Sequence, residues 1–176
     1  MAGKRVLDMG CGCGHGAAVL CINAASVLAV DINTVVVLSV GTADLKRLTI
    51  LRQDFFELAE DGAFDVVVSV EVFEHMTDLD RYLRKAARLA PYFFVTTPLA
   101  PVSAQTDNPD HVAEYSRHDF LGLLRQHFDV LDEFYQRSDL TITREPCLPS
   151  GSSMQPGHAV QMAWCRSKSP IGGVHE

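Results

Sequence analysis

The fold is decided by residues 6–16, which read VLDMGCGCGHG. An apolar run ends in Asp8, and four glycines then occupy every second position from Gly10 to Gly16. Glycines at this spacing allow a sharp backbone turn and a close approach of the backbone to a ligand, and a helix that starts there exposes its first amide groups. The stretch therefore predicts a strand, a ligand-binding turn and a helix.

A second acidic residue supports a ligand that carries a ribose. The next apolar run, VLAVDIN at residues 27–33, places Asp31 about twenty residues after the first glycine, where a carboxylate can accept hydrogen bonds from both ribose hydroxyls. Gly12, Gly14 and Ala17 also fit the GxGxxG/A dinucleotide pattern. These two features alone do not separate a nicotinamide site from an adenosylmethionine site.

The rest of the chain alternates short apolar runs with amphipathic stretches, which is typical of a mostly parallel sheet. Strands are predicted at residues 5–9, 27–31, 48–52, 64–70, 92–97, 128–136 and 160–166. Helices are predicted at 78–89, with its charges on a solvated face, and at 117–127, with Ser116 as the cap. We also expect a crossover helix at 34–45 despite its β-branched residues, because parallel neighbours require one.

These elements predict an α/β fold, a Rossmann-like, doubly wound, mostly parallel seven-stranded sheet with an antiparallel late strand, in a three-layer αβα sandwich. With 176 residues, the chain is expected to form one domain at 1–166, followed by a disordered tail at 167–176. Residues 146–157, rich in Pro, Ser and Gly, are expected to form a loop.

Composition bounds the location and the partners. The hydrophobic fraction of 47% and the charged fraction of 21% are those of a globular protein, and we expect no membrane span and no signal peptide. Five cysteines without a CxxC pair predict reduced thiols and a cytoplasmic protein. The net charge of -7 repels phosphate backbones, so nucleic acid is disfavoured as a partner.

Four motifs in order carry a resemblance to a known family: DMGCGCG, AVDIN, QDFF at 53–56 and FDVVVSVEVFEH at 64–75. Together they resemble class I S-adenosylmethionine-dependent methyltransferases, in particular the type 11/12-like group that includes small-molecule O-methyltransferases. The resemblance covers roughly residues 6–136 and implies S-adenosylmethionine as cofactor, with S-adenosylhomocysteine as product. The cofactor-binding residues that it implies are Asp8, Gly10, Gly12, Asp31, Ile32, Asp54, Phe55, Val70 and Glu71.

Within that set the resemblance implies particular contacts. Gly10 and Gly12 would line the methionine part, Asp31 would hold the ribose, and Asp54 would meet the adenine amino group. Since the cofactor carries a sulfonium and an ammonium group but no phosphate, nearby carboxylates favour it. Two alternatives stay open: Asp8 would act either by direct contact or by binding the glycine turn, and Asp54 could be only a turn residue.

The chemical step mainly requires alignment and, for a hydroxyl acceptor, removal of a proton. Glu74 and His75, just after the fourth strand, are the predicted catalytic residues, with His75 preferred as base because imidazole ordinarily titrates near neutral pH. In many resembling sequences, however, this EH pair only begins the next helix. No residue is assigned to a metal, although Glu71, Glu74, His75 and His111 could offer ligands to Mg²⁺ or Mn²⁺.

The acceptor side is predicted from residues 96–115, a proline-containing segment expected to cover the substrate. Its HVAEYS motif resembles methyltransferases of small molecules, so we expect O-methylation of a small hydroxylated acceptor. Family members usually carry N-terminal lid helices that look missing here, so we expect either that the chain is a truncated fragment or that a homodimer or a partner subunit covers the site. The alternatives are an enzyme like the metal-dependent RNA 3′-terminal 2′-O-methyltransferases, a non-catalytic cofactor-binding subunit and, least favoured, an NAD oxidoreductase.

Overall fold

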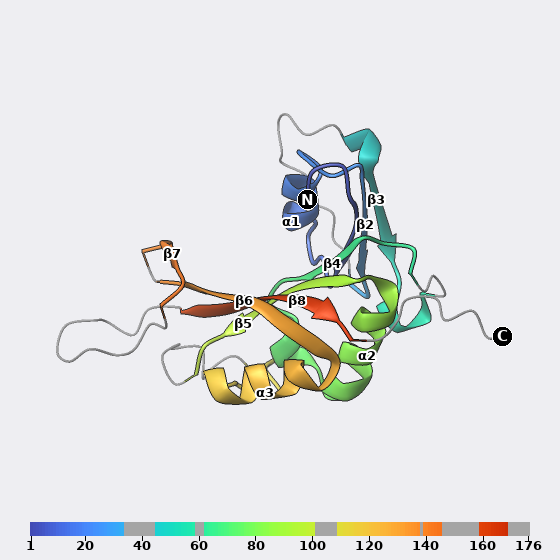
Figure 1. Cartoon of the computed structure of the whole chain (residues 1–176). Helices are drawn as coiled ribbons and strands as arrows, with labels where there is room; N and C mark the ends of the chain where they lie inside the picture. The colour runs from blue at the N-terminus through green and yellow to red at the C-terminus, as the bar shows by residue number, and fades with distance from the viewer. Residues whose placement is uncertain (34–44, 59–61, 101–108, 138, 146–158, 169–176) are drawn as a thin grey trace.

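The computed structural model describes residues 1–33, 45–58, 62–100, 109–137, 139–145 and 159–168. They build one sheet with the strand order β3-β2-β1-β4-β5-β8-β6-β7 (Figure 1). The strands are β1 (Arg5–Met9), β2 (Ser26–Asp31), β3 (Leu48–Arg52), β4 (Val66–Ser69), β5 (Tyr92–Pro98), β6 (Phe128–Gln136), β7 (Ile142–Thr143) and β8 (Val160–Ser167). The helices are α1 (His15–Leu20), α2 (Leu79–Leu89) and α3 (Arg117–His127), with short 3₁₀ turns η1 (Leu45–Arg47), η2 (Phe55–Glu57) and η3 (Phe73–His75).

The strand order reverses at β1, and the point of this reversal is where a ligand-binding site is expected. From β1 the chain proceeds outward to β2 and β3 on one side, and then returns to β4 and β5 on the other, all in parallel pairs. In an open α/β sheet, ligands bind outside the carboxyl ends of the strands at such a switch point. Strand β8 then pairs antiparallel with both β5 and β6.

Helices cover both faces of the sheet, so the molecule has three layers (Figure 1). Successive side chains of a strand point to opposite faces. Leu7 of β1 therefore joins the core beneath α2 and α3, whereas its neighbour Val6 joins the core beneath α1. In the described part of the chain, no helix is long and apolar enough to cross a membrane.

Helix α2 is fixed at its start and along its charged side. Asp78 caps it by accepting a hydrogen bond from the amide of Arg81 at 3.0 Å. The guanidinium of Arg81 lies 4.0 Å from the ring centre of Phe56, and Lys85 donates a hydrogen bond to the carbonyl of Leu58. The arginines of this side are exposed, as expected, but Arg81 and Lys85 also connect α2 to the segment after β3.

The expected fold class is confirmed, with differences at several boundaries. An eighth, two-residue strand, β7, pairs with β6, and β4 ends at Ser69 rather than at Val70. Ser167, expected in the tail, is the last residue of β8, and its hydroxyl donates to the carbonyl of Ala87 at 3.0 Å. The crossover helix expected at 34–45 lies outside the described residues except for Leu45, and so does the loop expected at 146–157.

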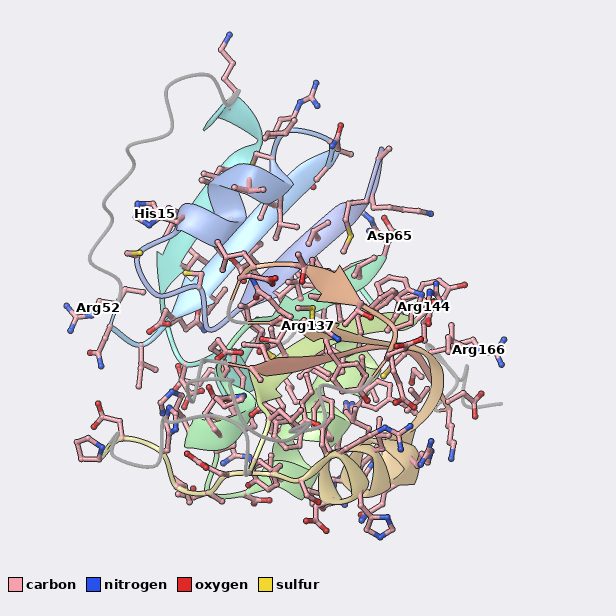
Figure 2. All side chains as sticks on the ribbon, turned by 90° about the vertical axis from the view of Figure 1, so that its left-hand side faces the viewer. His15, Arg52, Asp65, Arg137, Arg144 and Arg166 are labelled. Carbon is pink, nitrogen blue, oxygen red and sulfur yellow. The ribbon has the colours of Figure 1, made fainter. Side chains whose placement is uncertain are left out.

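Surface ion pairs connect β6 to neighbouring parts of the chain. Arg144 and Arg166, both labelled in Figure 2, pair with Asp132 and Asp129 of β6, at 2.5 and 3.1 Å between nitrogen and oxygen. Exposed pairs of this kind contribute about 0–1 kcal/mol each. They neutralise acids of β6, which lies on the other side of β5 and β8 from the glycine turn.

Candidate cofactor and acceptor site

The glycine turn has a backbone that only glycine adopts without strain. Gly10, Gly12 and Gly14 have φ angles of +82°, +52° and +85°. The amide groups of Gly10 and Cys11 donate to the carbonyl of Val30 at 2.9 and 3.2 Å, which attaches the turn to the end of β2. Ligands can therefore approach the backbone here without meeting side chains.

Asp31 at the end of β2 is held by two backbone amides. Its carboxylate accepts hydrogen bonds from Gly12 at 2.9 Å and from Asn33 at 2.8 Å. A carboxylate offers about four lone pairs, so both oxygens can still accept from a ligand. The predicted ribose acid is thus fixed in direction and joined to the glycine turn.

A cavity of about 720 Å³ lies over the carboxyl ends of β1, β2 and β4. Its volume falls within the range of about 300–1,000 Å³ that is typical of small-molecule sites. The structure brings eight of the nine predicted cofactor residues together in its lining: Gly10, Gly12, Asp31, Ile32, Asp54, Phe55, Val70 and Glu71. His75, one of the two predicted catalytic residues, lines the same cavity, so residues predicted to bind the cofactor and a residue predicted to be catalytic lie around one space.

Asp8 lies elsewhere, in an adjoining groove of about 470 Å³ that it lines together with Gly10, Cys11 and Gly16. Its side chain is buried, and this burial, with a further contribution from the charge of Asp31, raises the pKa of Asp8 to about 6. Burial, together with the negative charges of Asp8 and Asp31, raises the pKa of Cys11 to about 12, so its thiol stays protonated. Because Asp8 lines this groove and not the main cavity, its location favours a role through the glycine turn over direct contact with a ligand in the main cavity.

The raised pKa of Asp8 predicts a pH-dependent stability. Because the folded state prefers the neutral acid, the free energy of unfolding falls as the pH rises from about 4 to about 6, by about 3 kcal/mol for this group. We expect Asp8→Asn to match the wild type at pH 4 and to be more stable by about 2–3 kcal/mol at pH 7. Urea unfolding of both proteins at the two pH values measures this difference. An equal difference at both would contradict the prediction.

Glu71 adopts a φ of +55°, which is strained for a residue other than glycine. Thr96 of β5 stabilises it twice: the Thr96 hydroxyl accepts from the amide of Glu71 at 3.0 Å and donates to its carboxylate at 2.7 Å. Burial raises the pKa of Glu71, and the hydrogen bond from Thr96 partly opposes the rise. The left-handed backbone at Glu71 changes the direction of the chain after β4, and Glu71 and Val72 then line the cavity.

Glu74 is fully buried behind the cavity, in η3. Its Oε2 accepts from the hydroxyl of Thr97 at 3.0 Å, and its backbone carbonyl accepts from the amide of Val112 at 2.9 Å. Burial raises the pKa of Glu74, whereas the residue's own backbone amide and the hydroxyl of Thr97 lower it. This residue therefore joins η3 to β5 and to the segment before α3.

His75 is oriented by the same segment. Its Nδ1 lies 2.8 Å from the carbonyl oxygen of Asp110, an acceptor only, so Nδ1 carries the hydrogen and Nε2 is left with a lone pair. Nε2 lies 3.9 Å from Oε1 of Glu74, and the ring of His111 meets that of His75 edge-on, with 4.9 Å between centres. Glu74, His75 and His111, predicted as possible neighbours, do come together.

The cavity also has lining residues that the sequence did not single out: Cys11, Cys13, Asn33, Phe56, Val72, Met76 and Asp110. The two cysteines alternate with the glycines, and Phe56 follows Phe55, so proximity in sequence could have indicated them. Asp110 is 35 positions from His75, and no local pattern indicates it. A glycine turn, a ribose-type acid and a cavity at the switch point define a Rossmann-like α/β protein of the nucleoside-binding class.

Comparisons with known proteins give the family. A model described as "Methyltransferase domain" matches residues 1–141. A probable S-adenosylmethionine-dependent methyltransferase of Mycobacterium tuberculosis, Rv3030, is 32% identical over 129 residues, 69% of this chain and 47% of that protein. A ubiquinone biosynthesis O-methyltransferase of Ralstonia nicotianae is 34% identical over 97 residues, 51% of this chain and 40% of that protein. The chain therefore belongs to the class I S-adenosylmethionine-dependent methyltransferase family, and it spans about half the length of the curated relatives it matches.

A solved structure agrees on the fold. The 1,6-didemethyltoxoflavin-N1-methyltransferase of Burkholderia thailandensis, with bound 1,6-didemethyltoxoflavin and S-adenosylhomocysteine, has a TM-score of 0.69 to this chain at 19% identity. The match covers 96% of this chain and 72% of that one. At this identity the likeness concerns the fold alone.

Proposed function

We propose that the protein transfers a methyl group from S-adenosylmethionine to the hydroxyl of a small acceptor. The observation that carries the proposal is that a single cavity is lined by the glycine turn, by Asp31 and by His75. A cofactor held by the glycine turn and Asp31 would direct its methyl group towards His75. Family membership supports the cofactor, and the relative from Ralstonia, an O-methyltransferase, supports an oxygen acceptor.

The residues present fit this cofactor. The backbone at Gly12 has open space where a Cβ would stand, so the methionine part can lie against it. Asp31, Asp54 and Glu71 line the cavity and would favour the net positive charge of the cofactor. Phe55 and Ile32 supply apolar surface for the adenine ring, and Asp54 would accept from the adenine amino group, although it also caps η2 through the amide of Phe56 at 2.9 Å.

The bound cofactor supplies a methyl group on a sulfonium, and the protein must remove the acceptor proton. His75 would take that proton at Nε2, because Nδ1 donates to the carbonyl of Asp110 and keeps the ring in this tautomer. Glu74, 3.9 Å from Nε2, would stabilise the positive charge that the ring gains. Glu74 and His75 are thus proposed as a positioning acid and its base.

The charge of the chain supports a small acceptor rather than RNA. The net charge is -7, and acids, not lysines or arginines, line the cavity beside its apolar residues. Binding to a phosphate backbone would require the opposite sign. Thiols rather than disulfides at Cys11, Cys13 and Cys165, among the residues that the structure describes, support a reducing, cytoplasmic setting.

A second chain over the site is also proposed, on one observation. The groove next to the glycine turn exposes apolar side chains, including Val19 at 60% and Val70 at 47% of their surface. Burial of such a patch is favourable by about 25 cal/mol per Å². Either a homodimer or a partner subunit would supply that burial, and light scattering of the purified protein at several concentrations separates a dimer from a monomer.

Thermal shift with competing cofactors tests the proposed function. We expect S-adenosylmethionine and S-adenosylhomocysteine to raise the melting temperature and NAD to leave it unchanged. The reason is that the carboxylates lining the cavity would repel the negatively charged pyrophosphate of NAD, which the other two ligands lack. A panel of small alcohols and phenols with the labelled methyl donor then tests transfer. Stabilisation without transfer would favour a non-catalytic subunit, and a shift with NAD alone would overturn the proposal.

Asp31→Ala tests the ribose contact. The substitution removes the acceptor of two ligand hydroxyls, and hydrogen bonds to a charged group contribute about 1.5–3 kcal/mol each, so we expect at least a tenfold rise in Kd for S-adenosylhomocysteine by calorimetry. Asp129→Ala, which removes an exposed acid of β6 paired with Arg166, is the control and should bind as the wild type does. Equal losses in both variants would contradict the assignment.

A further inference from the structure

A short segment before α3 lies along η3, the turn that carries His75. The amide of Val112 donates to the backbone carbonyl of Glu74 at 2.9 Å. On the other side of His111, the carbonyl of Asp110 accepts from Nδ1 of His75 at 2.8 Å. His111 lies between these two attachments, so its backbone is fixed beside η3 from both directions.

The polar contacts of His75 alone fix its ring only in part. Its side chain is 34% exposed, and the 3.9 Å from Nε2 to Oε1 of Glu74 are too long for a hydrogen bond. Three χ1 rotamers, two ring orientations and two neutral tautomers give a histidine about twelve arrangements. The hydrogen bond to Asp110 favours one of them by at most about tenfold, so only about half of the molecules would adopt it on that basis.

The ring of His111 supplies a further restriction. It meets the ring of His75 edge-on, with 4.9 Å between centres and 75° between planes. Aromatic pairs in this geometry are favoured by about two- to tenfold. The hydrogen bond and the ring contact together would therefore hold up to about nine tenths of the molecules in the arrangement with the hydrogen on Nδ1 and the lone pair on Nε2.

The polar atoms of His111 do not explain why its ring lies there. Its Nδ1 is buried and has no hydrogen-bond partner among the residues that the structure describes. An unpaired buried nitrogen opposes folding, so hydrogen bonding by this atom is not what places the ring. His75 lines the main cavity, whereas His111 does not belong to its described lining. A ligand there would contact His75, and His111 would act on that ligand through His75.

We propose that His111 is a positioning residue for His75. Its ring holds the imidazole in the arrangement in which Nδ1 donates to Asp110 and Nε2 is free to accept a proton. As far as catalysis is concerned, this role rests on the proposed function, because it matters for transfer only if Nε2 takes the acceptor proton. Loss of the ring would then lower the competent fraction about twofold, from about nine tenths to about half.

Nuclear magnetic resonance of the ligand-free protein tests this role without cofactor or acceptor. In protein labelled with ¹⁵N-histidine, the shifts of the two ring nitrogens report which one carries the hydrogen, and loss of the signals in His75→Gln assigns them. At pH 8, where imidazole is ordinarily neutral, we expect the Nδ1–H form of His75 in about nine tenths of wild-type molecules and in about half of His111→Ala molecules.

His111→Phe is the conservative variant, since it keeps an aromatic ring and removes the nitrogens. We expect it to restore the wild-type fraction of the Nδ1–H form and to melt no lower than the wild type, because the unpaired buried nitrogen is gone. His118→Ala, which removes an exposed histidine of α3, is the control and should leave the tautomer of His75 unchanged.

Two results overturn the proposal. One is an unchanged tautomer of His75 in His111→Ala. The other is a fraction in His111→Phe as low as in His111→Ala, which would mean that a nitrogen of His111 is required and not its ring. Circular dichroism verifies that each variant is folded, and if His111→Ala is not, His111→Leu replaces it, because leucine fills the space without an aromatic ring.

Activity separates this role from the proposed function. In a chain that transfers methyl groups, kcat of His111→Ala should fall about twofold with KM unchanged and should return in His111→Phe. A chain that shows the tautomer change but methylates no acceptor keeps the role of His111 and loses the proposed function. An active chain in which His111→Ala changes neither the tautomer nor kcat does the reverse.

Discussion

Gly12→Ala is expected to weaken binding of S-adenosylhomocysteine about 100-fold while the protein stays folded. In the ligand-free protein a Cβ at this position meets nothing within 4 Å, and Gly12 lines the cavity. The added methyl group therefore occupies space that the ligand needs, not space that the protein fills. Overpacking of this kind costs about 1–3 kcal/mol, and 1.4 kcal/mol corresponds to a tenfold change in affinity.

Gly3→Ala is the matched control for this prediction. Gly3 has a φ of +67°, close to the +52° of Gly12, and a Cβ there also meets nothing within 4 Å. Both substitutions should lower the free energy of unfolding by a similar amount, about 1–2 kcal/mol for an alanine in the left-handed region. Only Gly12→Ala should raise the Kd in calorimetry. Equal affinities of the two variants would show that no ligand lies against Gly12.

Much of the fold is readable from local patterns because the parallel strands are short, apolar and bounded by polar residues. Arg5–Met9, Leu48–Arg52 and Arg117–His127 have the predicted bounds, and Ser116 caps α3 as expected. Strand β7 could not be predicted, since two residues show no periodicity and their pairing depends on β6 alone.

The site is readable only where residues close in sequence form it. The glycine turn, Asp31 and the Glu74–His75 pair could be predicted from motifs. Two features depend on distant contacts: the left-handed φ of Glu71, which the side chain of Thr96 stabilises, and the tautomer of His75, which Asp110 sets. No glycine indicates the former, and no spacing indicates the latter.

Gly10→Ala is expected to have the largest effect on stability, a loss of about 3 kcal/mol in the free energy of unfolding. Two causes add. An alanine at a φ of +82° costs about 1–2 kcal/mol, and its Cβ would overlap Cγ2 of Val72, an overpacking worth about 1–3 kcal/mol. Urea unfolding at pH 7 measures the loss.

A double-mutant cycle separates the two causes. Val72→Ala removes both γ-carbons and leaves a Cβ that would lie 3.4 Å from the new methyl group, an ordinary contact. In that background Gly10→Ala should cost only the backbone part, so the two substitutions together should be less destabilising than their sum by at least about 1 kcal/mol. If the costs simply add, the backbone conformation alone requires glycine here. A coupling of this size would instead mean that Val72 packs closely against the glycine turn. Because Gly10 and Val72 both line the main cavity, this packing would fix the position of the backbone against which the cofactor is proposed to bind.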